Sequence, residues 1–352
     1  MHDQVGPHLA AGYDAPPVQL VDDGRQHLGR FHGPPPRANL IDAKLHHWPR
    51  ALRSLRLKEW QAIQMVTPRL FVNLALFDAR LMALRQVKIY DRERKVKHLH
   101  ERKLRPGALA IADQLLDSVN RHADKSGHLE FRNRFGAGAI DVDLRLAATA
   151  KAPAVAGRFT IHVDRGAPQI VSLPFAGNVG MYSAKGMFPV SGELELDGER
   201  HALAPTDTLV LLDDHKGYYP HVMTWDWVTS AAFVDGVACG LNLTRNQCRE
   251  PEQYNENCAW RGDRLGRLPA VAFTRERERQ AGERWRVRDR DGRVDLEFEP
   301  TVPGDVKVNA VIVKSKYRGP FGLLRGRLEP EGLDPITVDG WFGMGEQFWL
   351  RC

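Results

Sequence analysis

The sequence predicts an almost entirely β protein made of two antiparallel barrels or sandwiches in tandem. Short runs rich in β-branched and aromatic residues, each bounded by Pro, Gly, Asp or Asn, recur along the 352 residues. Asp-Gly pairs stand between several of these runs, and this dipeptide favours the tight turn of a β-hairpin. Roughly ten runs fall on each side of residue 200, which is enough to close a small barrel in each half. We therefore expect two antiparallel β-barrels or sandwiches in tandem.

The individual elements follow from the same signals. The clearest strand candidates are 59–66, 70–77, 81–90, 138–146 and 158–163. Hairpin turns are predicted at Asp197-Gly198, Asp235-Gly236, Asp291-Gly292 and Asp339-Gly340. The segment 107–121 is the exception, because its apolar residues recur at helical spacing after Pro106. It predicts a helix, so the fold should hold one or two short helices among its strands.

The turn Asp291-Gly292 allows a register to be predicted. Both arms around it alternate with period two, and pairing Arg290 with Arg293 sets Trp285 opposite Phe298. The same register sets the Arg residues of the first arm opposite acidic residues of the second. One face of the hairpin should therefore belong to the core, and the other should carry opposite charges that stabilise it by roughly 0.2–1 kcal/mol per pair.

The net charge of +6, from 50 basic and 44 acidic residues, raises the question of nucleic-acid binding. Much of the basic surplus lies in the hairpin described above, where acidic residues across the strands neutralise it. The other basic stretch, 92–105, is interrupted by Glu93 and Glu101 and is typical of a solvated strand or loop. We expect no nucleic-acid partner.

Composition divides the chain into three parts. Residues 1–45 hold Pro16-Pro17 and Pro34-Pro35-Pro36 without sustained periodicity, which predicts an N-terminal arm or tail. The first barrel is expected over 46–204 and the second over 205–352. No apolar run approaches the ~18 residues that cross a bilayer, and the first thirty residues lack a secretory pattern. We expect a cytoplasmic protein without a membrane span.

Motifs for common cofactors are missing from the sequence. It has no dinucleotide-binding glycine motif, no P-loop and no nucleophile elbow. The close histidine pairs, His98 with His100 and His215 with His221, imply no third metal ligand. The four cysteines are scattered and lack Cys-x-x-Cys spacing, so they predict reduced thiols. We expect neither a cofactor nor a metal.

The densest group of polar and aromatic residues lies between 213 and 227. A carboxylate or imidazole in a barrel interior is costly unless it is paired or functional. Asp214 and His215 are therefore catalytic candidates, and the aromatic residues that follow them are ligand-binding candidates: Tyr218, Tyr219, Trp225 and Trp227. The alternative is structural, with Asp214 accepting backbone donors in a loop, His215 on the surface, and the two Trp side chains in the core.

A second group precedes Cys258. Glu256 is a candidate catalytic carboxylate, and Asn257 beside it is a candidate ligand-binding amide. The alternative is an edge turn held by Asx hydrogen bonds, because Asn side chains readily bond the backbone two residues on. The residue types alone leave both interpretations open.

Several motifs together resemble the bacterial domain-of-unknown-function 2804 family over about 37–352. They are Pro-x-Ser-Gly-x-Leu-x-Leu-x-Gly after Phe188, Asp214-His215-x-Gly217, Trp225-x-Trp227, Asp235-Gly236, Glu256-Asn257 and Gly345-Glu346. Lys58-Glu59-Trp60 and the segment 87–91 also fit the family. More distantly, the order of the Asp-His-x-Gly and Trp-x-Trp motifs is similar to that of the superfamily of carotenoid hydratases, lipocalin-like secreted-hydrolase relatives and fungal decalin-forming cyclases.

The distant resemblance implies tandem calycin-like barrels and a cofactor-free site for an apolar, alkene-bearing substrate. Asp214 would donate a proton, and aromatic faces would stabilise the positive charge that develops. Lys216 stands where the hydratase-like motif has an aromatic residue. Two functions follow: a hydratase, isomerase or cyclase acting on a lipid or isoprenoid-like substrate, or a lipocalin-like protein that binds a hydrophobic small molecule while Asp214 and Glu256 brace loops.

Overall fold

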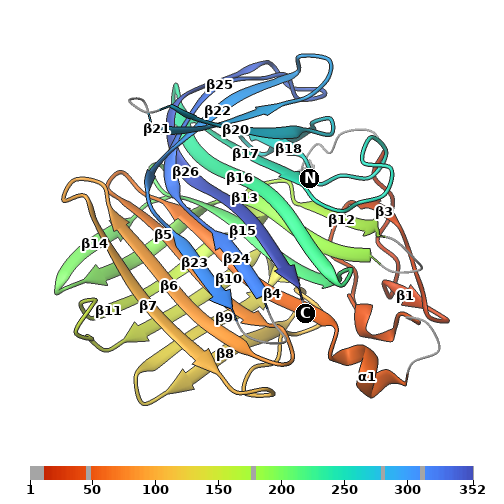
Figure 1. Cartoon of the computed structure of the whole chain (residues 1–352). Helices are drawn as coiled ribbons and strands as arrows, with labels where there is room; N and C mark the ends of the chain where they lie inside the picture. The colour runs from red at the N-terminus through yellow and green to blue at the C-terminus, as the bar shows by residue number, and fades with distance from the viewer. Residues whose placement is uncertain (1–11, 45–48, 176–179, 279–281, 310–313, 352) are drawn as a thin grey trace, which may run out of the picture. The chain divides into compact units, whose positions relative to one another are not determined.

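Strands account for nearly all regular structure in the computed structural model, which describes residues 12–44, 49–175, 180–278, 282–309 and 314–351. Helices in this part of the chain are short: α1 (Arg50–Ser54) and the 3-10 turns η1 (Leu40–Asp42), η2 (Phe135–Ala137) and η3 (Val163–Arg165). The strands form two large curled sheets (Figure 1). The prediction of a mainly β, antiparallel protein with one or two short helices is confirmed.

The chain divides into two compact units. Of the described residues, the first unit contains those within 14–172 and 180–218, and the second contains 12–13, 173–175 and those within 219–351. Strand β15 (Leu209–Tyr218) pairs with β4 (Leu57–Val66) on one side and with β13 (Gly180–Leu196) on the other. Because of these two ladders, the chain leaves the first unit only after Tyr218.

The sheet of the first unit has 13 strands in the described residues. Its order is β7 (Val96–Leu104), β6 (Ala83–Asp91), β5 (Leu70–Asp78), β4, β15, β13, β11 (Val155–His162), β10 (Ala139–Leu146), β9 (Gly127–Arg134) and β8 (Ser118–Asp124), with β14 (Glu199–Leu203), β12 (Gln169–Pro174) and β3 (Gly29–Phe31) attached. The five strands predicted before residue 165 are all present, with ends that differ from the predicted ones by up to three residues. β7 is an edge strand with mostly exposed or half-exposed side chains, as the sequence around 92–105 indicated.

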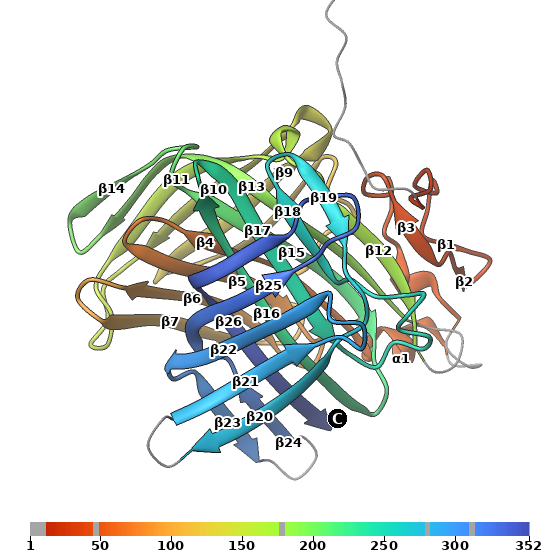
Figure 2. The ribbon, with the colours of Figure 1, turned by 90° about the horizontal axis from the view of Figure 1, so that it is seen from above.

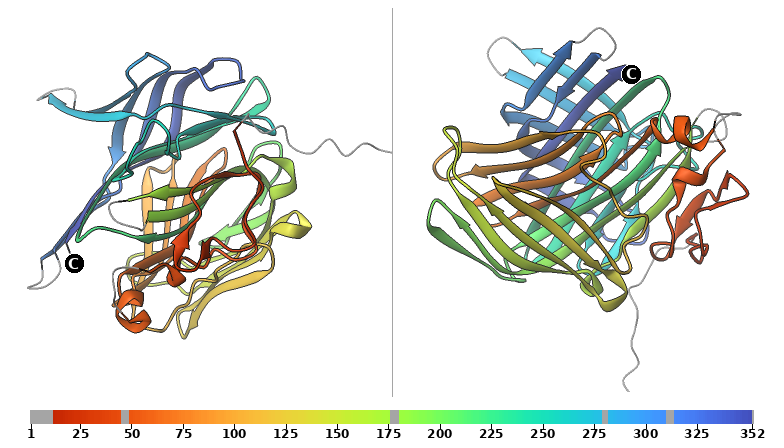
Figure 3. Two further views of the ribbon diagram at one scale, coloured as in Figure 1. Left: turned by 90° about the vertical axis from the view of Figure 1, so that its right-hand side faces the viewer. Right: turned by 90° about the horizontal axis from the view of Figure 1, so that it is seen from below.

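Side chains join the two ends of this sheet. Arg85 of β6 donates hydrogen bonds to the Gly127 carbonyl oxygen at 2.8 Å and to Ser126 Oγ at 2.6 Å. Arg102 of β7 forms an ion pair with Asp124 of β8 at 3.0 Å. The curl of the sheet brings these end strands together (Figure 3). The result is a half-barrel whose concave face holds the main apolar core.

That core explains which residues point inward. Ile63, Leu74, Val87, Leu129 and Leu212 are fully or almost fully buried members of one apolar cluster. A smaller cluster lies under the N-terminal arm, where the apolar side chains come from the arm and from the sheet: Leu20, Phe31, Leu40, Leu57, Tyr182 and Tyr218. The arm also contains the two-stranded ladder β1 (Val21–Asp22) and β2 (Arg25–Gln26).

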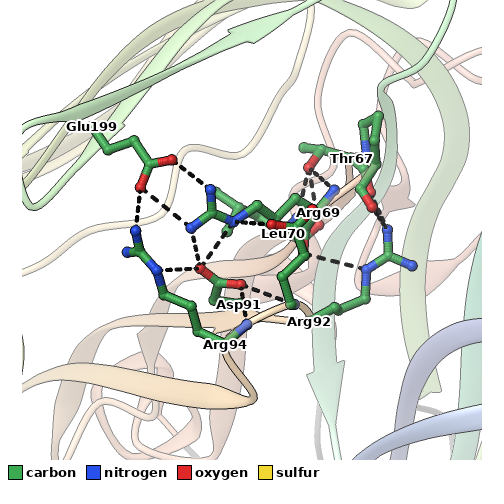
Figure 4. Close-up of polar contacts among 9 residues, drawn as sticks. Thr67, Arg69, Leu70, Asp91, Arg92, Arg94 and Glu199 are labelled. Atoms are coloured by element: carbon green, nitrogen blue, oxygen red, sulfur yellow. Dashed lines mark hydrogen bonds and ion pairs between the residues drawn. The ribbon is translucent and has the colours of Figure 1, made fainter.

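An ion-pair cluster holds three turns of the first unit together (Figure 4). Arg69 binds the buried Asp91 carboxylate at 2.6 Å and also contacts Glu199 on β14. Arg94 pairs with the same Glu199 at 2.9 Å. Burial alone would raise the pKa of Asp91, but hydrogen bonds from Arg69 and from the backbone lower it to about 2. The short strand β14 is thereby tied to the turns that flank β5 and β6.

The sheet of the second unit has 11 strands in the described residues. Its order is β19 (Arg264–Arg267), β18 (Cys258–Arg261), β17 (Val237–Arg245), β16 (Val222–Val234), β26 (Ile336–Arg351), β25 (Phe321–Leu328), β22 (Val294–Val302), β21 (Gly282–Arg288) and β20 (Ala272–Glu278), with β24 (Lys314–Arg318) paired to β26 and β23 (Asp305–Asn309) paired to β24. Figure 2 shows β22, β21 and β20 side by side at one end of this order.

The hairpin between β21 and β22 has the predicted register. Trp285 pairs with Phe298 and Arg288 with Asp295. The two aromatic rings are fully buried and meet edge to face at 5.3 Å between centroids, while Arg288 and Asp295 form an exposed ion pair at 2.7 Å. The core face and the charged face therefore lie where the alternation of the sequence places them.

Of the other three hairpins predicted at Asp-Gly pairs, the structure contains two. Asp197-Gly198 joins β13 to β14, and Asp235-Gly236 joins β16 to β17, each as a two-residue hairpin with positive φ at both positions. The hairpin predicted at Asp339-Gly340 is wrong, because both residues lie inside β26. The register against β25 shifts there, so the positive φ of Gly340 forms a bulge instead of a turn.

The helix predicted over 107–121 is also wrong. The segment has no helix, and its last residues begin β8. Leu109 and Ile111 pack into the main core, and Leu115 packs into the cluster under the arm. The Ala112 amide donates to Asn120 Oδ1 at 2.7 Å. Burial of its apolar side chains and hydrogen bonds from side chains to its backbone thus stabilise a non-helical conformation in this segment, although its apolar spacing is typical of a helix.

Candidate functional site

The candidate site lies around β15, whose ten residues are all buried. Four consecutive polar residues, Asp213 to Lys216, occupy its second half. Successive side chains of a strand point to opposite faces, so this run divides into two pairs. The face that carries Ile63 and Leu212, and therefore the main core, is called the inner face. The opposite side is called the outer face.

The outer face carries Asp213 and His215. Asp213 accepts hydrogen bonds from Trp60 Nε1 at 3.0 Å and from Lys185 Nζ at 2.6 Å. His215 lies directly opposite Trp60 in the ladder, and their rings stack with centroids 3.9 Å apart. Burial, and then the positive charges of Lys185 and Lys216, lower the pKa of His215 well below its ordinary value. This imidazole is therefore neutral at pH 7.

The inner face carries Asp214 and Lys216. Lys216 is 1% exposed at its side chain and donates from Nζ to Glu59 Oε1 at 3.0 Å and to the Ala112 carbonyl oxygen at 2.7 Å. Glu59 is directly opposite Lys216 on β4 and also accepts from Arg80. Burying two charges is favourable only when each is paired and hydrogen-bonded, and here both conditions are met.

Asp214 differs from these neighbours. Its side chain is buried, and its Oδ1 has no hydrogen-bond partner among the residues that the structure describes. Burial raises the pKa of Asp214 to about 7; Lys216 opposes the rise, whereas Asp213 and Glu59 add to it. The carboxyl group is therefore part protonated at neutral pH, and it has an oxygen available for an incoming group.

The residues across from Asp214 are Gln61 and Ala184. Gln61 is fixed by a buried amide network: it donates to Asn133 Oδ1 at 2.7 Å and accepts from Asn120 Nδ2 at 2.6 Å. These amides link β4 to β8 and β9 across the concave side of the sheet. Ala184 has only a methyl group, so it places little bulk beside the carboxyl of Asp214.

Two tyrosines complete the inner face. Tyr182 lies directly opposite Lys216 on β13, and burial together with the charge of Asp214 raises its pKa well above the ordinary value. Tyr218 is buried near the arm, and its hydroxyl donates to the Ile41 carbonyl oxygen at 3.4 Å. Burial raises the pKa of Tyr218 to about 12. Both phenols remain neutral and offer aromatic surface.

The other predicted site residues belong to the second unit. Trp227 donates from Nε1 to Asn242 Oδ1 at 2.7 Å. Trp225 donates to Glu346 Oε2 at 2.9 Å and contacts the ring of Phe348 at 4.2 Å between centroids. Tyr219 lies 6.0 Å from Trp225 between ring centroids. Tyr219, which precedes β16, therefore forms one aromatic group with Trp225 of β16 and Phe348 of β26.

Glu256 and Asn257 form a braced turn. The Asn257 amide donates to Asn255 Oδ1 at 3.0 Å, which is an Asx bond. Asn257 Oδ1 accepts from the Thr244 amide at 2.7 Å, and the Glu256 carbonyl oxygen accepts from Asn242 Nδ2 at 2.8 Å. This geometry corresponds to the structural alternative described for the turn, although Glu256 itself is buried.

The sequence and the structure therefore select different partners for Asp214. Asp214 lies with Lys216 and Glu59 on one face, and His215 points to the other. Sequence reasoning missed Lys216 and Glu59 as site residues. A signal existed, because Asp214 and Lys216 are two positions apart on a strand, but the approach of Glu59 spans 157 positions.

Among the residues that the structure describes, no group of three or more His, Cys, Asp or Glu side chains is arranged to hold a metal ion. None of the helices described has the length and apolar character needed to span a membrane.

Comparisons with known proteins complete the description of the site. No curated protein sequence matches this chain. Among solved structures, a protein described as AttH from Nitrosomonas europaea shares 15% identity with it, at a TM-score of 0.49 over 86% of this chain and 96% of the other. Kievitone hydratase from Nectria haematococca shares 11% identity, at a TM-score of 0.41 over 84% and 88% of the two chains. The family described as "Domain of unknown function (DUF2804)" matches residues 16–351, and the chain belongs to this family.

Proposed function

We propose that the protein is a cofactor-free hydratase, isomerase or cyclase that protonates a carbon–carbon double bond of an apolar lipid or isoprenoid-like substrate. One observation carries this proposal. Asp214 places a buried carboxyl group, with an unpartnered Oδ1 and a pKa of about 7, on the apolar face of the sheet. A general acid works best when its pKa is near the operating pH.

The first step would be proton transfer from Asp214 to the alkene. A new C–H bond forms, the O–H bond breaks, and the products are a carbocation and the Asp214 carboxylate. Water can then attack the cation and return a proton to Asp214, which gives hydration. Loss of a neighbouring proton to Asp214 gives isomerisation. Attack by a second double bond closes a ring and moves the positive charge to a new carbon, which then loses a proton to Asp214.

The surroundings of Asp214 suit a cationic intermediate. The ring of Tyr182 is buried on the same face, and aromatic faces attract cations. The positive charge of Lys216 is balanced by Glu59 at 3.0 Å, so the ammonium group does not by itself exclude a second cation. Gln61 is held by Asn120 and Asn133 and is not available as a competing proton acceptor.

Solvent deuterium tests the proposal. Wild-type protein incubated in deuterium oxide with a panel of isoprenoid alkenes is expected to return products that carry carbon-bound deuterium, because all three reactions begin with protonation. Asp214→Asn removes the acid and preserves the shape, and should lower the rate by about 100-fold or more. Asp213→Asn removes a charge on the outer face that helps to raise the pKa of Asp214, so this comparison variant should keep deuterium incorporation and shift its pH dependence to lower pH.

The competing function is binding without turnover, and the same experiment separates the two. If the alkenes bind to wild-type protein and to Asp214→Asn with similar affinity while neither incorporates deuterium, the enzymatic proposal fails. The protein then acts as a carrier for a hydrophobic small molecule. Equal incorporation in both proteins would also contradict the role given to Asp214.

A further inference from the structure

We propose that Lys216 is a covalent attachment site for an apolar aldehyde, which it binds as a protonated Schiff base. This inference rests on the proposed function to the extent that both require an apolar ligand to reach the inner face of β15. It adds a second reactive group to that face and a second ligand class, since an aldehyde, unlike an alkene, reacts with an amine.

The position of Lys216 is unusual for a lysine. Lysine side chains are almost never fully buried, yet Lys216 is among the largest fully buried side chains of the chain. It lies two residues from Asp214 on the face that carries the apolar core. Buried lysines in apolar surroundings are the ones that serve as Schiff-base residues.

The counter-ion is already in place. Glu59 Oε1 lies 3.0 Å from Lys216 Nζ, and Arg80 holds the same carboxylate in position. A protonated Schiff base keeps the positive charge on nitrogen and retains one N–H, which can donate to Glu59. The hydrogen bond from Nζ to the Ala112 carbonyl oxygen would be released, so the segment around Ala112 is the part expected to adjust.

Asp214 can move the protons that the reaction needs. Its carboxylate form takes a proton from the Lys216 ammonium, and the free amine attacks the aldehyde carbon to form a C–N bond. After the proton moves from nitrogen to oxygen, the product is a neutral carbinolamine. Asp214 then protonates the carbinolamine hydroxyl, the C–O bond breaks, and water leaves. The aldehyde and the ammonium are thus converted into an iminium ion and water, with Asp214 back in its carboxylate form.

The other buried lysines, Lys58, Lys88 and Lys185, lack this combination. Lys185 lies on the outer face, where it binds Asp213 at 2.6 Å. Lys88 alternates with the core residues Val87 and Ile89 on β6 and therefore also points to the outer face. Lys58 donates to the carbonyl oxygens of Leu55 and Ala79. Lys185 is therefore a suitable control, being buried and paired with a carboxylate as Lys216 is.

All-trans-retinal is the probe for the experiment, because its absorption moves to longer wavelength when its Schiff base is protonated. Full-length protein is incubated with retinal, and borohydride then reduces the Schiff base to a stable amine. The protein is digested, and mass spectrometry of the peptides locates the modified residue. We expect a single retinyl adduct at Lys216 and a red-shifted absorption band before reduction. Lys216→Met should lose both signals, whereas Lys185→Met should keep them. Glu59→Gln removes the counter-ion and should lower the pH at which the band loses its red shift.

Retinol separates failure of this inference from failure of the proposed function. It has the same apolar skeleton but no carbonyl, so it can bind only without a covalent bond. If retinol binds to wild-type protein and retinal leaves Lys216 unmodified, the Schiff-base inference is overturned while the inner face remains an apolar site. If neither compound binds, both proposals are contradicted. Labelling spread over surface lysines at equal yield would also overturn the assignment to Lys216.

Discussion

Trp60 and His215 stack face to face on the outer side of the first sheet, with ring planes only 8° apart. They are direct partners across β4 and β15. The stack keeps a titratable ring in a fully buried position, where burial and two lysines keep it neutral. This arrangement has a measurable effect on how stability depends on pH.

The first prediction concerns acid stability. The pKa of His215 is lowered in the folded state, so below its ordinary value of about 6.5 the unfolded chain binds a proton that the folded chain does not. Stability should fall as the pH drops through this range, by about 1.4 kcal/mol per pH unit at most. His215→Phe keeps a ring against Trp60 and should show a shallower fall. Urea unfolding at several pH values measures the difference, and parallel curves for the two proteins would contradict it.

The second prediction has the opposite sign. The raised pKa of Asp214 means that between about pH 4 and pH 7 the folded protein holds a proton that the unfolded chain has lost. Asp214 therefore lowers stability as the pH rises through this interval. Asp214→Asn should be on the order of a few kcal/mol more stable, relative to wild type, at pH 8 than at pH 4. A difference that stays constant from pH 4 to pH 8 would mean that Asp214 is ionised throughout.

The third prediction separates the two faces of the β21–β22 hairpin. Phe298→Ala removes a fully buried ring from its contact with Trp285 and should cost about 3–5 kcal/mol of unfolding free energy. Arg288→Ala removes one partner of an exposed ion pair with Asp295 and should cost less than about 1 kcal/mol. Denaturant titrations of both variants check the contrast. Similar losses would mean that the charged face carries more of the stability than its exposure suggests.

The fourth prediction concerns the cluster of Figure 4. Arg69→Met leaves the buried carboxylate of Asp91 without its main partner and should destabilise the protein by about 3 kcal/mol at neutral pH. The exposed Arg94 contacts the same carboxylate less closely, at 3.9 Å, and Arg94→Met should cost less than about 1 kcal/mol.

The pKa of Asp91 provides an independent check on this cluster. Its value of about 2 lies below the unfolded value, so the stability that this group contributes is present above about pH 4 and is lost as the pH falls toward 2. In Arg69→Met the pKa of Asp91 should rise, which carboxyl NMR titration can follow. An unchanged pKa would show that the backbone donors alone hold Asp91 ionised.

Much of the fold could be predicted because β structure leaves a period of two in the sequence. The alternation around Asp291-Gly292 predicted the pairing of Trp285 with Phe298. The same dipeptide gave a wrong hairpin prediction at Asp339-Gly340, because a positive φ suits a bulge as well as a turn. The pairing of β25 with β26 decides between the two.

The helix prediction over 107–121 was wrong because tertiary packing, which local spacing does not show, decides the conformation there. The apolar residues of this segment are buried by distant strands and not by a helical face.

The candidate site was harder to predict because its members come from distant parts of the chain. Asp214 could be selected as a carboxylate in an apolar stretch, and the alternation of a strand separates it from His215 on the neighbouring position. Which of the two faces the core depends on β4, and the contact of Glu59 with Lys216 depends on the register of that ladder. Neither fact can be read from residues near Asp214 in the sequence.

The closure of the first sheet has a consequence for how that unit opens. In the described part of the chain, β7 and β8 each pair with a single neighbour, and no ladder of backbone hydrogen bonds joins them. The contacts across this line come from side chains, notably Arg85 and Arg102 with the β8–β9 turn. Separating the two edges therefore leaves every ladder intact and breaks only side-chain contacts, which include the packing of core residues such as Val87 and Leu129. Amide protons on the unpaired edges of β7 and β8 should exchange with solvent fastest among the strands of this sheet. The unit should therefore open locally between β7 and β8 at a lower free energy than global unfolding requires.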